Sequence, residues 1–449
     1  MITERQGGLV RLGALEAAAA IRDGRITSQD LVEACLARID EVEQDIQAWT
    51  FLDPEHALGQ ARAADEARSR GRPIGALHGV PVGIKDIIDT ADMPTEDGTV
   101  LHAGRRPRND ATVVSLLRAA GAVILGKTVT TELAVYAPGK TRNPHDPGRT
   151  PGGSSSGSAA AVAAHMVPLA IGTQTNGSVI RPASYCGVVG YKPTHGLISR
   201  TGILRQSRML DHVGVFARSI ADAALLAQTL MSFDAADRDM QPRARPRLAD
   251  AVSRLLPFPP RFAFVKTPMW GEASADTQAA FDELVQSLGD RVSEVTLPDP
   301  FSDGVDLHRL IVESDLALSF APEYEAGAAQ LSATLRQMIE RGQRHLALDY
   351  NRAVARSAVY NQALDDVFHE MHAIVTPATT GEAPRGLQST GNPVFCTLWT
   401  LCGLPAVTVP VMQGADGMPI GVQLVGPRGD DARLLQCARW LMEQLNGAE

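Results

Sequence analysis

The sequence is poor in cysteine, in aromatic residues and in positive charge. Its 449 residues include five cysteines, an odd number without the spacing of metal ligands, and 5% aromatic residues. A disulfide framework is therefore excluded, and we expect a reduced, cytoplasmic protein without a metal site. The 42 Lys and Arg are outnumbered by 51 Asp and Glu, which gives a net charge of −9. Because phosphate binding needs clustered positive charge, no nucleic-acid partner is expected.

Long apolar runs are also absent. The longest, residues 159–171, is interrupted by His165 and Pro168. It falls short of the roughly 20 apolar residues that span a membrane. Residues 1–8 are polar and have no apolar segment of a signal peptide behind them. We therefore expect no membrane partner.

The pattern of apolar and turn residues indicates an α/β protein. The first 70 residues are expected to be helical, with a helix start at Thr27. Strands are then expected at 80–84, 122–125, 167–171 and 262–265. Helices are expected at 112–120 (capped by Asp110), 158–165, 220–232, 276–288 and 431–445, with a long helical stretch at 306–371. Residues 233–260 are polar and Pro-rich, as in a surface connection, and length alone suggests two or three domains.

Two loops rich in small residues lie near the middle of this pattern. Residues 152–157 read GGSSSG and residues 173–178 read TQTNGS, with a helix pattern and an apolar strand between them. Such loops let backbone N–H groups converge on a ligand and leave hydroxyls uncovered. A helix that leaves the first loop and a strand that returns can set Ser154 beside Ser178. The alternative is a pair of flexible turns, but the flanking elements are strongly apolar.

A third motif, GVPVGIKD at residues 79–86, places Lys85 at the end of an apolar run. A serine hydroxyl needs a base to act as a nucleophile. A lysine can be that base only where burial lowers its pKa. Lys85, Ser154 and Ser178 are therefore candidate catalytic residues, although a lysine at a strand end, taken alone, is more often a surface residue.

Together these motifs resemble the amidase signature family, hydrolases with a Ser–cis-Ser–Lys triad, over nearly the whole chain. The resemblance implies one α/β domain over residues 1–449, with a mixed central β-sheet covered by helices on both faces. This domain would comprise N-terminal helices (1–70), a signature core (71–232), a variable region (233–370) and a C-terminal core segment (371–449). It also implies an amidase that converts a carboxamide to a carboxylate and ammonia or an amine, without a cofactor.

The resemblance assigns roles to the residues of the loops. Ser178 would be the nucleophile that forms an acyl-enzyme, and Ser154, after a cis Gly153–Ser154 peptide bond, would relay the proton to Lys85. Ser155 would be a supporting hydroxyl. The oxyanion hole would consist of four backbone N–H groups, those of Thr175, Asn176, Gly177 and Ser178.

The second loop departs from the usual family form, in which Asp and Gly stand at the positions of Gln174 and Asn176. Asn176 would narrow the pocket or require a positive φ. The GTQT form followed by SVIRPA, and the segment 389–411, are similar to malonamidase-type members. Arg181 and Gln174 are candidate substrate-binding residues, because an arginine fork can bind the carboxylate of a half-amide. The alternative is that Arg181 pairs with a buried acid such as Asp211.

Two other functions compete with an amidase that acts on a small-molecule amide. The glutamine-hydrolysing component of tRNA-dependent amidotransferases, their A subunit, resembles the family too and would work with a partner protein. A nucleotide-binding protein would use Gly121–Thr128, GAVILGKT, as a phosphate loop, but a helix precedes this segment and a strand runs through it. A homodimer would follow from the resemblance. The sequence leaves open which amide is cleaved.

Overall fold

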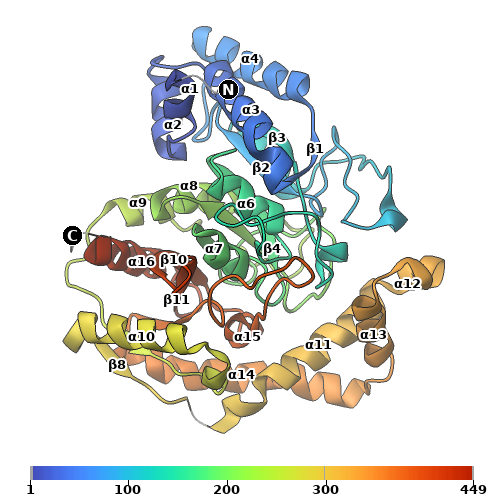
Figure 1. Ribbon diagram of the computed structural model, residues 1–449, viewed down its shortest axis with the longest axis vertical. Helices are drawn as coiled ribbons and strands as arrows, with labels where there is room; N and C mark the ends of the chain where they lie inside the picture. The colour runs from blue at the N-terminus through green and yellow to red at the C-terminus, as the bar shows by residue number, and fades with distance from the viewer. Residues whose placement is uncertain (1–3, 298, 447–449) are drawn as a thin grey trace.

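The computed structural model describes residues 4–297 and 299–446. Its strands form one 11-stranded mixed sheet in the order β1-β3-β2-β4-β6-β5-β10-β11-β9-β7-β8 (Figure 1). The strands are β1 (Trp49–Leu52), β2 (Pro81–Lys85), β3 (Val123–Thr128), β4 (Leu169–Gln174), β5 (Val189–Lys192), β6 (His212–Ala217), β7 (Phe262–Phe264), β8 (Val292–Glu294), β9 (Ala373–Pro377), β10 (Ala406–Gln413) and β11 (Pro419–Val425).

Helices cover both faces of this sheet, which confirms the expected fold class and the single large domain. Helices α6 and α7 pack against each other and on the central strands, and α8, α9 and α16 form a second packed group. The helices are α1 (Glu4–Leu9), α2 (Ala14–Arg22), α3 (Ser28–Ile46), α4 (Pro54–Ser69), α5 (Thr112–Ala119), α6 (Ser156–Ala163), α7 (Ile180–Cys186), α8 (Ile220–Leu230), α9 (Leu248–Ser253), α10 (Ala275–Leu288), α11 (Gly304–Ser319), α12 (Ala321–Gly327), α13 (Ala333–Gly342), α14 (Ala347–Glu370), α15 (Val394–Leu401) and α16 (Asp431–Asn446). No helix of the described residues is both long and apolar enough to cross a membrane.

Several local expectations are confirmed and others are wrong. Thr27 caps α3, since its side chain accepts from the N–H of Asp30 while the Asp30 carboxylate accepts from the N–H of Thr27. Asp110 does not cap α5: it binds the N–H of Ala91 and the guanidinium of Arg118, and the helix begins without a side-chain cap. The first 70 residues are not all helical, because residues 49–52 form the edge strand β1, which pairs with β3. The long helical stretch is divided into α11–α14, with a proline in the first turn of α12.

The segment Gly121–Thr128 is not a phosphate loop. Its second half is the interior of β3, and Lys127 is buried within that strand. The Lys127 ammonium donates to the Pro94 carbonyl at 3.1 Å and lies 3.1 Å from the Asp86 carboxylate. A lysine held in this way cannot reach a nucleotide, so the nucleotide-binding alternative is excluded.

The carboxyl ends of two parallel strands position the two serine loops. Ile84 of β2 pairs with Ile171 of β4, so Lys85 and the end of β4 meet at the same edge of the sheet. Helix α6 starts directly after the first loop and β4 returns to this edge, which confirms the expected path of the chain. At Gly157, a Cβ would lie 2.2 Å from the Ala48 carbonyl oxygen and 2.4 Å from the Val129 nitrogen. Only glycine therefore allows the start of α6 to approach the end of β3 so closely.

Candidate active site

Lys85 lies at the base of the site with no exposed surface. Its Nζ contacts the Ser154 hydroxyl at 2.7 Å and the Thr173 hydroxyl at 2.8 Å. Burial lowers the pKa of Lys85 well below its usual value of 10.5, and the negative charge of Asp211 opposes this shift. Because neither contacting group carries a charge, the site favours an uncharged amine.

The two candidate serines lie in different surroundings. Ser154 is buried, and its peptide bond to Gly153 is cis. Ser178 lies in the turn between β4 and α7, is 9% exposed and lines a cavity. The structure places the Lys85–Ser154 pair in direct contact, whereas Ser178 makes no side-chain hydrogen bond with any described residue. Its hydroxyl is therefore free to meet a ligand in the cavity.

The loop of Ser178 has two fixed carbonyl groups. His308 of α11 donates through Nε2 to the Thr175 carbonyl at 2.9 Å, and the Thr400 hydroxyl of α15 donates to the Asn176 carbonyl at 2.6 Å. A peptide unit is planar, so a held carbonyl also fixes the direction of the N–H that follows it. The contacts to the Thr175 and Asn176 carbonyls thus fix the directions of the N–H groups of Asn176 and Gly177. Among the described residues, none accepts a hydrogen bond from the N–H groups of residues 175–178.

Asn176 has a different effect from the one expected. Asn176 does not have a positive φ, so the expectation that this position requires one was wrong. Its side chain accepts from the Thr397 hydroxyl at 2.8 Å and donates to the Tyr136 hydroxyl at 3.1 Å. Asn176 therefore connects the loop to α15 and to one wall of the cavity, which it lines.

Gln174, Ser155 and Arg181 all brace the loops. The Gln174 side chain accepts from the N–H groups of Val179 and Ile180 (2.8 and 3.0 Å) at the start of α7. Ser155 exchanges hydrogen bonds of 3.2 Å with the backbone of Thr173, the residue that contacts Lys85. Neither Gln174 nor Ser155 lines the cavity that Ser178 lines, so these contacts support the loops rather than bind a ligand.

Arg181 does not pair with Asp211. Its guanidinium is 1% exposed and donates to the Gly153 carbonyl at 2.7 Å and to the Gly391 carbonyl at 2.9 Å. Asp211 instead accepts from the Thr175 hydroxyl. The expectation that Arg181 pairs with a buried acid was therefore wrong, because its partners are two backbone carbonyls. This placement favours a role in holding the 153 loop over a role in binding substrate.

Two adjoining cavities lead away from Ser178. The inner cavity, about 20 Å³, reaches the serine, and the outer cavity, about 310 Å³, shares several of its walls. The inner cavity is lined by Ala134, Val135, Tyr136, Thr175, Asn176, Ser178, Gln206, Val312, Leu316 and Met338. The outer cavity adds Val305, His308, Arg309, Glu313, Thr334, Arg341, Asn392, Pro393, Val394 and Thr397.

Sequence reasoning missed several residues that shape the site. Thr173, at the end of β4, contacts Lys85. Its place as the first hydroxyl residue of the 173–178 loop is a sequence feature from which this contact could have been predicted. His308, Tyr136 and Thr400 come from segments far from the loop in sequence. No local pattern marks them, because their role depends on how α11 and α15 pack over the sheet.

Comparisons with known proteins show the family to which this chain belongs. A family model described as Amidase matches residues 30–435. The A subunit of the glutamyl-tRNA(Gln) amidotransferase of Chloroflexus aggregans is 36% identical over 460 residues, which cover 93% of each chain. The putative amidase AmiD of Mycobacterium tuberculosis is 35% identical over 465 residues, which cover 98% of this chain and 96% of AmiD.

A solved structure extends the likeness to three dimensions. The X-ray structure of native peptide amidase from Stenotrophomonas maltophilia superposes with a TM-score of 0.85 at 29% identity, with 97% of both chains covered. The chain therefore belongs to the amidase family. It is an amidase, a hydrolase that acts on the C–N bond of an amide.

The placement of Arg181 leads to a first prediction. Arg181→Lys should lower kcat by a similar factor for a carboxylate-bearing amide and for a neutral amide, because lysine cannot bind both carbonyls in a fork. Steady-state kinetics on malonamate and on an aryl amide measure the two factors. A loss confined to KM for malonamate would instead assign Arg181 to substrate binding.

Proposed function

We propose that this chain hydrolyses uncharged carboxamides through an acyl-enzyme on Ser178, without a partner subunit. The observation that carries the proposal is the 2.7 Å contact between the buried Lys85 amine and the Ser154 hydroxyl, next to a cavity that Ser178 lines. A buried amine beside a hydroxyl is the pairing that a serine nucleophile needs for its activation.

The first step forms the bond between Ser178 Oγ and the amide carbonyl carbon. The Ser178 proton passes to Ser154, and the Ser154 proton passes to the uncharged Lys85 amine. The lysine can accept this proton because its burial favours the neutral form. Ser154 is thus a relay that both receives and gives a proton, and no net charge is left on it.

The oxyanion that forms on the substrate is stabilised by the N–H groups of residues 175–178. Preorganised donors of this kind contribute about 2.7–4 kcal/mol each to transition-state stabilisation. The hydrogen bonds from His308 and Thr400 to the loop carbonyls support this role, because they hold two of the donors in place before the substrate arrives.

Breakdown of the intermediate reverses the proton path. The lysine proton returns through Ser154 to the leaving nitrogen, the C–N bond breaks, and ammonia or an amine departs. Water then attacks the acyl-enzyme by the same route, giving its proton to the relay and releasing a carboxylate and free Ser178.

The walls of the cavity indicate the substrate class. Among the described residues that line the inner cavity, none carries a charge, and Val312, Leu316 and Met338 make one side apolar. Farther out, Arg341 lies 2.6 Å from Glu313, and Arg309 lies 2.8 Å from Asp306. Since the charges of the outer cavity already have partners, an apolar and uncharged acyl group fits best.

The same walls argue against the amidotransferase function. Glutamine carries an ammonium and a carboxylate close to its carboxamide, and both need partners when they leave water. The uncharged inner cavity offers none. Sequence identity does not separate the two functions, because the amidotransferase relative and the putative amidase are 36% and 35% identical to this chain. The pocket chemistry is therefore the observation that favours a free-standing enzyme.

A half-amide substrate and a homodimer are the two finer expectations of the sequence. Arg181, the group expected to bind the half-amide carboxylate, is already engaged by two carbonyls. We therefore place malonamate below neutral amides in the order of preference. A homodimer of this chain stays a prediction, for which size measurement in solution is the test.

The second prediction identifies the nucleophile. A fluorophosphonate should label Ser178, and Ser178→Ala should lose labelling and about 10⁴-fold or more of kcat. Ser156→Ala is the matched control, since the Ser156 hydroxyl faces the Val129 carbonyl and should keep both. Mass spectrometry locates the adduct, and an adduct on another residue would contradict the mechanism.

The third prediction concerns the base. Because the pKa of Lys85 is lowered, kcat/KM should rise with pH to a plateau, with a midpoint well below 10.5. Lys85→Ala should lose as much activity as Ser178→Ala, since members of one catalytic unit are not additive. The exposed Lys140, changed to alanine, serves as the control. Near-normal turnover by Lys85→Ala would refute the triad.

The fourth prediction separates the two substrate classes. The purified chain alone should cleave hexanamide or benzamide with a kcat/KM roughly 100-fold above that for glutamine, measured as ammonia release. Val312→Thr keeps the volume of the side chain but adds a hydroxyl, so it should raise KM for hexanamide and spare acetamide. Efficient glutamine turnover that depends on a second protein would favour the amidotransferase instead.

A further inference from the structure

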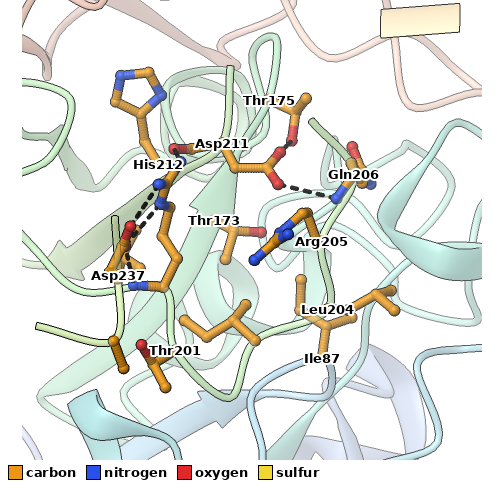
Figure 2. A pocket seen from close by; sticks show the side chains of 14 residues that line it. Ile87, Thr173, Thr175, Thr201, Leu204, Arg205, Gln206, Asp211, His212 and Asp237 are labelled. Atoms are coloured by element: carbon orange, nitrogen blue, oxygen red, sulfur yellow. Dashed lines mark hydrogen bonds and ion pairs between the residues drawn. The ribbon is translucent and has the colours of Figure 1, made fainter. Parts of the chain in front are cut away.

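A third cavity adjoins the Ser178 loop and shares Thr175 and Gln206 with the inner cavity. This rear cavity, about 50 Å³, lies between the end of β4 and the segment 200–213. Figure 2 shows the Asp211 carboxylate next to Thr175 and Gln206, and Thr173 also lines this cavity. The rear cavity thus exposes the back of two loop residues, one of which contacts Lys85.

Asp211 gathers three donors at this cavity. Its carboxylate accepts from the Thr175 hydroxyl at 2.6 Å and from the N–H group of Gln206 at 2.9 Å (Figure 2). It also accepts from the N–H group of Ser207 at 3.0 Å. Hydrogen bonds to a carboxylate are stronger than those between neutral groups. Thr175 is therefore held on its side chain by Asp211 and on its carbonyl by His308.

These two contacts leave Thr175 little freedom to rotate. The Thr175 carbonyl belongs to the same rigid peptide unit as the N–H of Asn176. A change in the Thr175 side-chain position therefore moves a proposed oxyanion donor. Asp211 itself touches neither the cavity beside Ser178 nor the serine, so any effect on the reaction must pass through Thr175.

Asp211 also acts on Lys85 through its charge. Among the described residues, it is the charged group that opposes the effect of burial on the pKa of Lys85. Burial raises the pKa of Asp211 itself to about 6, so this negative charge is present above that pH. Thr173 contacts Lys85, lines the rear cavity and carries no charge. The groups that face Asp211 are the Thr175 hydroxyl, the two N–H groups, and Arg200, whose guanidinium is engaged by Asp237 and Asp239. His212 next to it is uncharged, because burial lowers its pKa.

We infer that Asp211 is a positioning residue that holds the proposed oxyanion loop through the Thr175 hydroxyl. This inference rests on the proposed function of Ser178 and Lys85. It adds a residue that touches no reacting atom but controls the geometry of the oxyanion hole.

Two variants separate the geometric effect from the charge effect. Thr175→Val removes the hydroxyl and leaves the carboxylate, so kcat should fall roughly 10- to 100-fold while the midpoint of the kcat/KM–pH profile stays. Asp211→Asn removes the charge as well. Its kcat should fall similarly, and its midpoint should move to lower pH by on the order of half a unit. The sign follows because a negative charge stabilises the protonated lysine, and its loss lets Lys85 deprotonate at lower pH.

Asp431→Asn is the matched control. Asp431 is a buried carboxylate with contacts of the same kind, to Tyr191 and Thr194, but its lysine neighbour is Lys192. This variant should leave the midpoint in place. Titration of active sites with a fluorophosphonate corrects each kcat for the folded fraction, so a purely structural loss does not imitate a loss in kcat.

The outcomes distinguish this inference from the proposed function. Full kcat per labelled site in both variants would overturn the inference and leave the triad intact. Should Asp211→Asn fail to fold, the kcat of Thr175→Val still tests whether the contact between Thr175 and Asp211 positions the loop. Asp211→Glu keeps the negative charge, so the midpoint of its kcat/KM–pH profile should stay in place. Activity of Lys85→Ala would overturn the proposed function itself.

Discussion

A lysine without exposed surface at the end of a central strand is the constraint on which the site depends. Taking an ammonium out of water is unfavourable, and hydroxyl groups alone cannot compensate for it, so Lys85 favours the amine form. An amine keeps a lone pair, and that lone pair is what a serine proton needs. The fold therefore favours the uncharged form of the proposed base, because Lys85 is buried and contacts no carboxylate. The two groups that contact Lys85, the hydroxyls of Ser154 and Thr173, are uncharged and therefore do not favour the ammonium form.

The loop that carries Ser178 is made of small residues and cannot fix its own shape. Its stiffness comes from outside. His308 and Thr400 hold two carbonyls, Asp211 holds a side chain, and Arg181 holds the neighbouring loop through the Gly153 carbonyl. Each of these groups stands on a different element. A change in how α11 or α15 packs would thus reach the oxyanion donors without any change in the loop itself.

Local patterns in the sequence were sufficient for the elements that the loops connect, but not for the supports. The strand before Lys85, the helix after Ser155 and the cap at Thr27 all depend on neighbouring residues, and they could be predicted. His308 and Thr400 act across 133 and 224 residues of sequence, and β1 forms only because β3 offers an edge. Arg181 shows a different limit. An arginine beside the proposed nucleophile suggests an anionic substrate, yet in this fold two carbonyl oxygens accept from the Arg181 guanidinium, and its Nε has no partner among the described residues. Only the fold decides which acceptors an arginine meets.

The chemistry and the selectivity of this amidase are carried by different parts of the chain. Lys85, Ser154 and Ser178 lie on strands and loops of the central sheet, whereas Val312, Leu316 and Met338 come from α11 and α13, which project beside it (Figure 1). Under the proposed function, substitutions at these three cavity-lining positions alter which acyl group is accepted, whereas His308 of α11 holds the Thr175 carbonyl and belongs to the supports of the loop. This separation explains how an amidotransferase component and an amidase can be similarly related to one chain. The proposed triad is a poor guide to the substrate, and under the proposed function the uncharged inner cavity beside Ser178 is the feature that favours a neutral amide over glutamine.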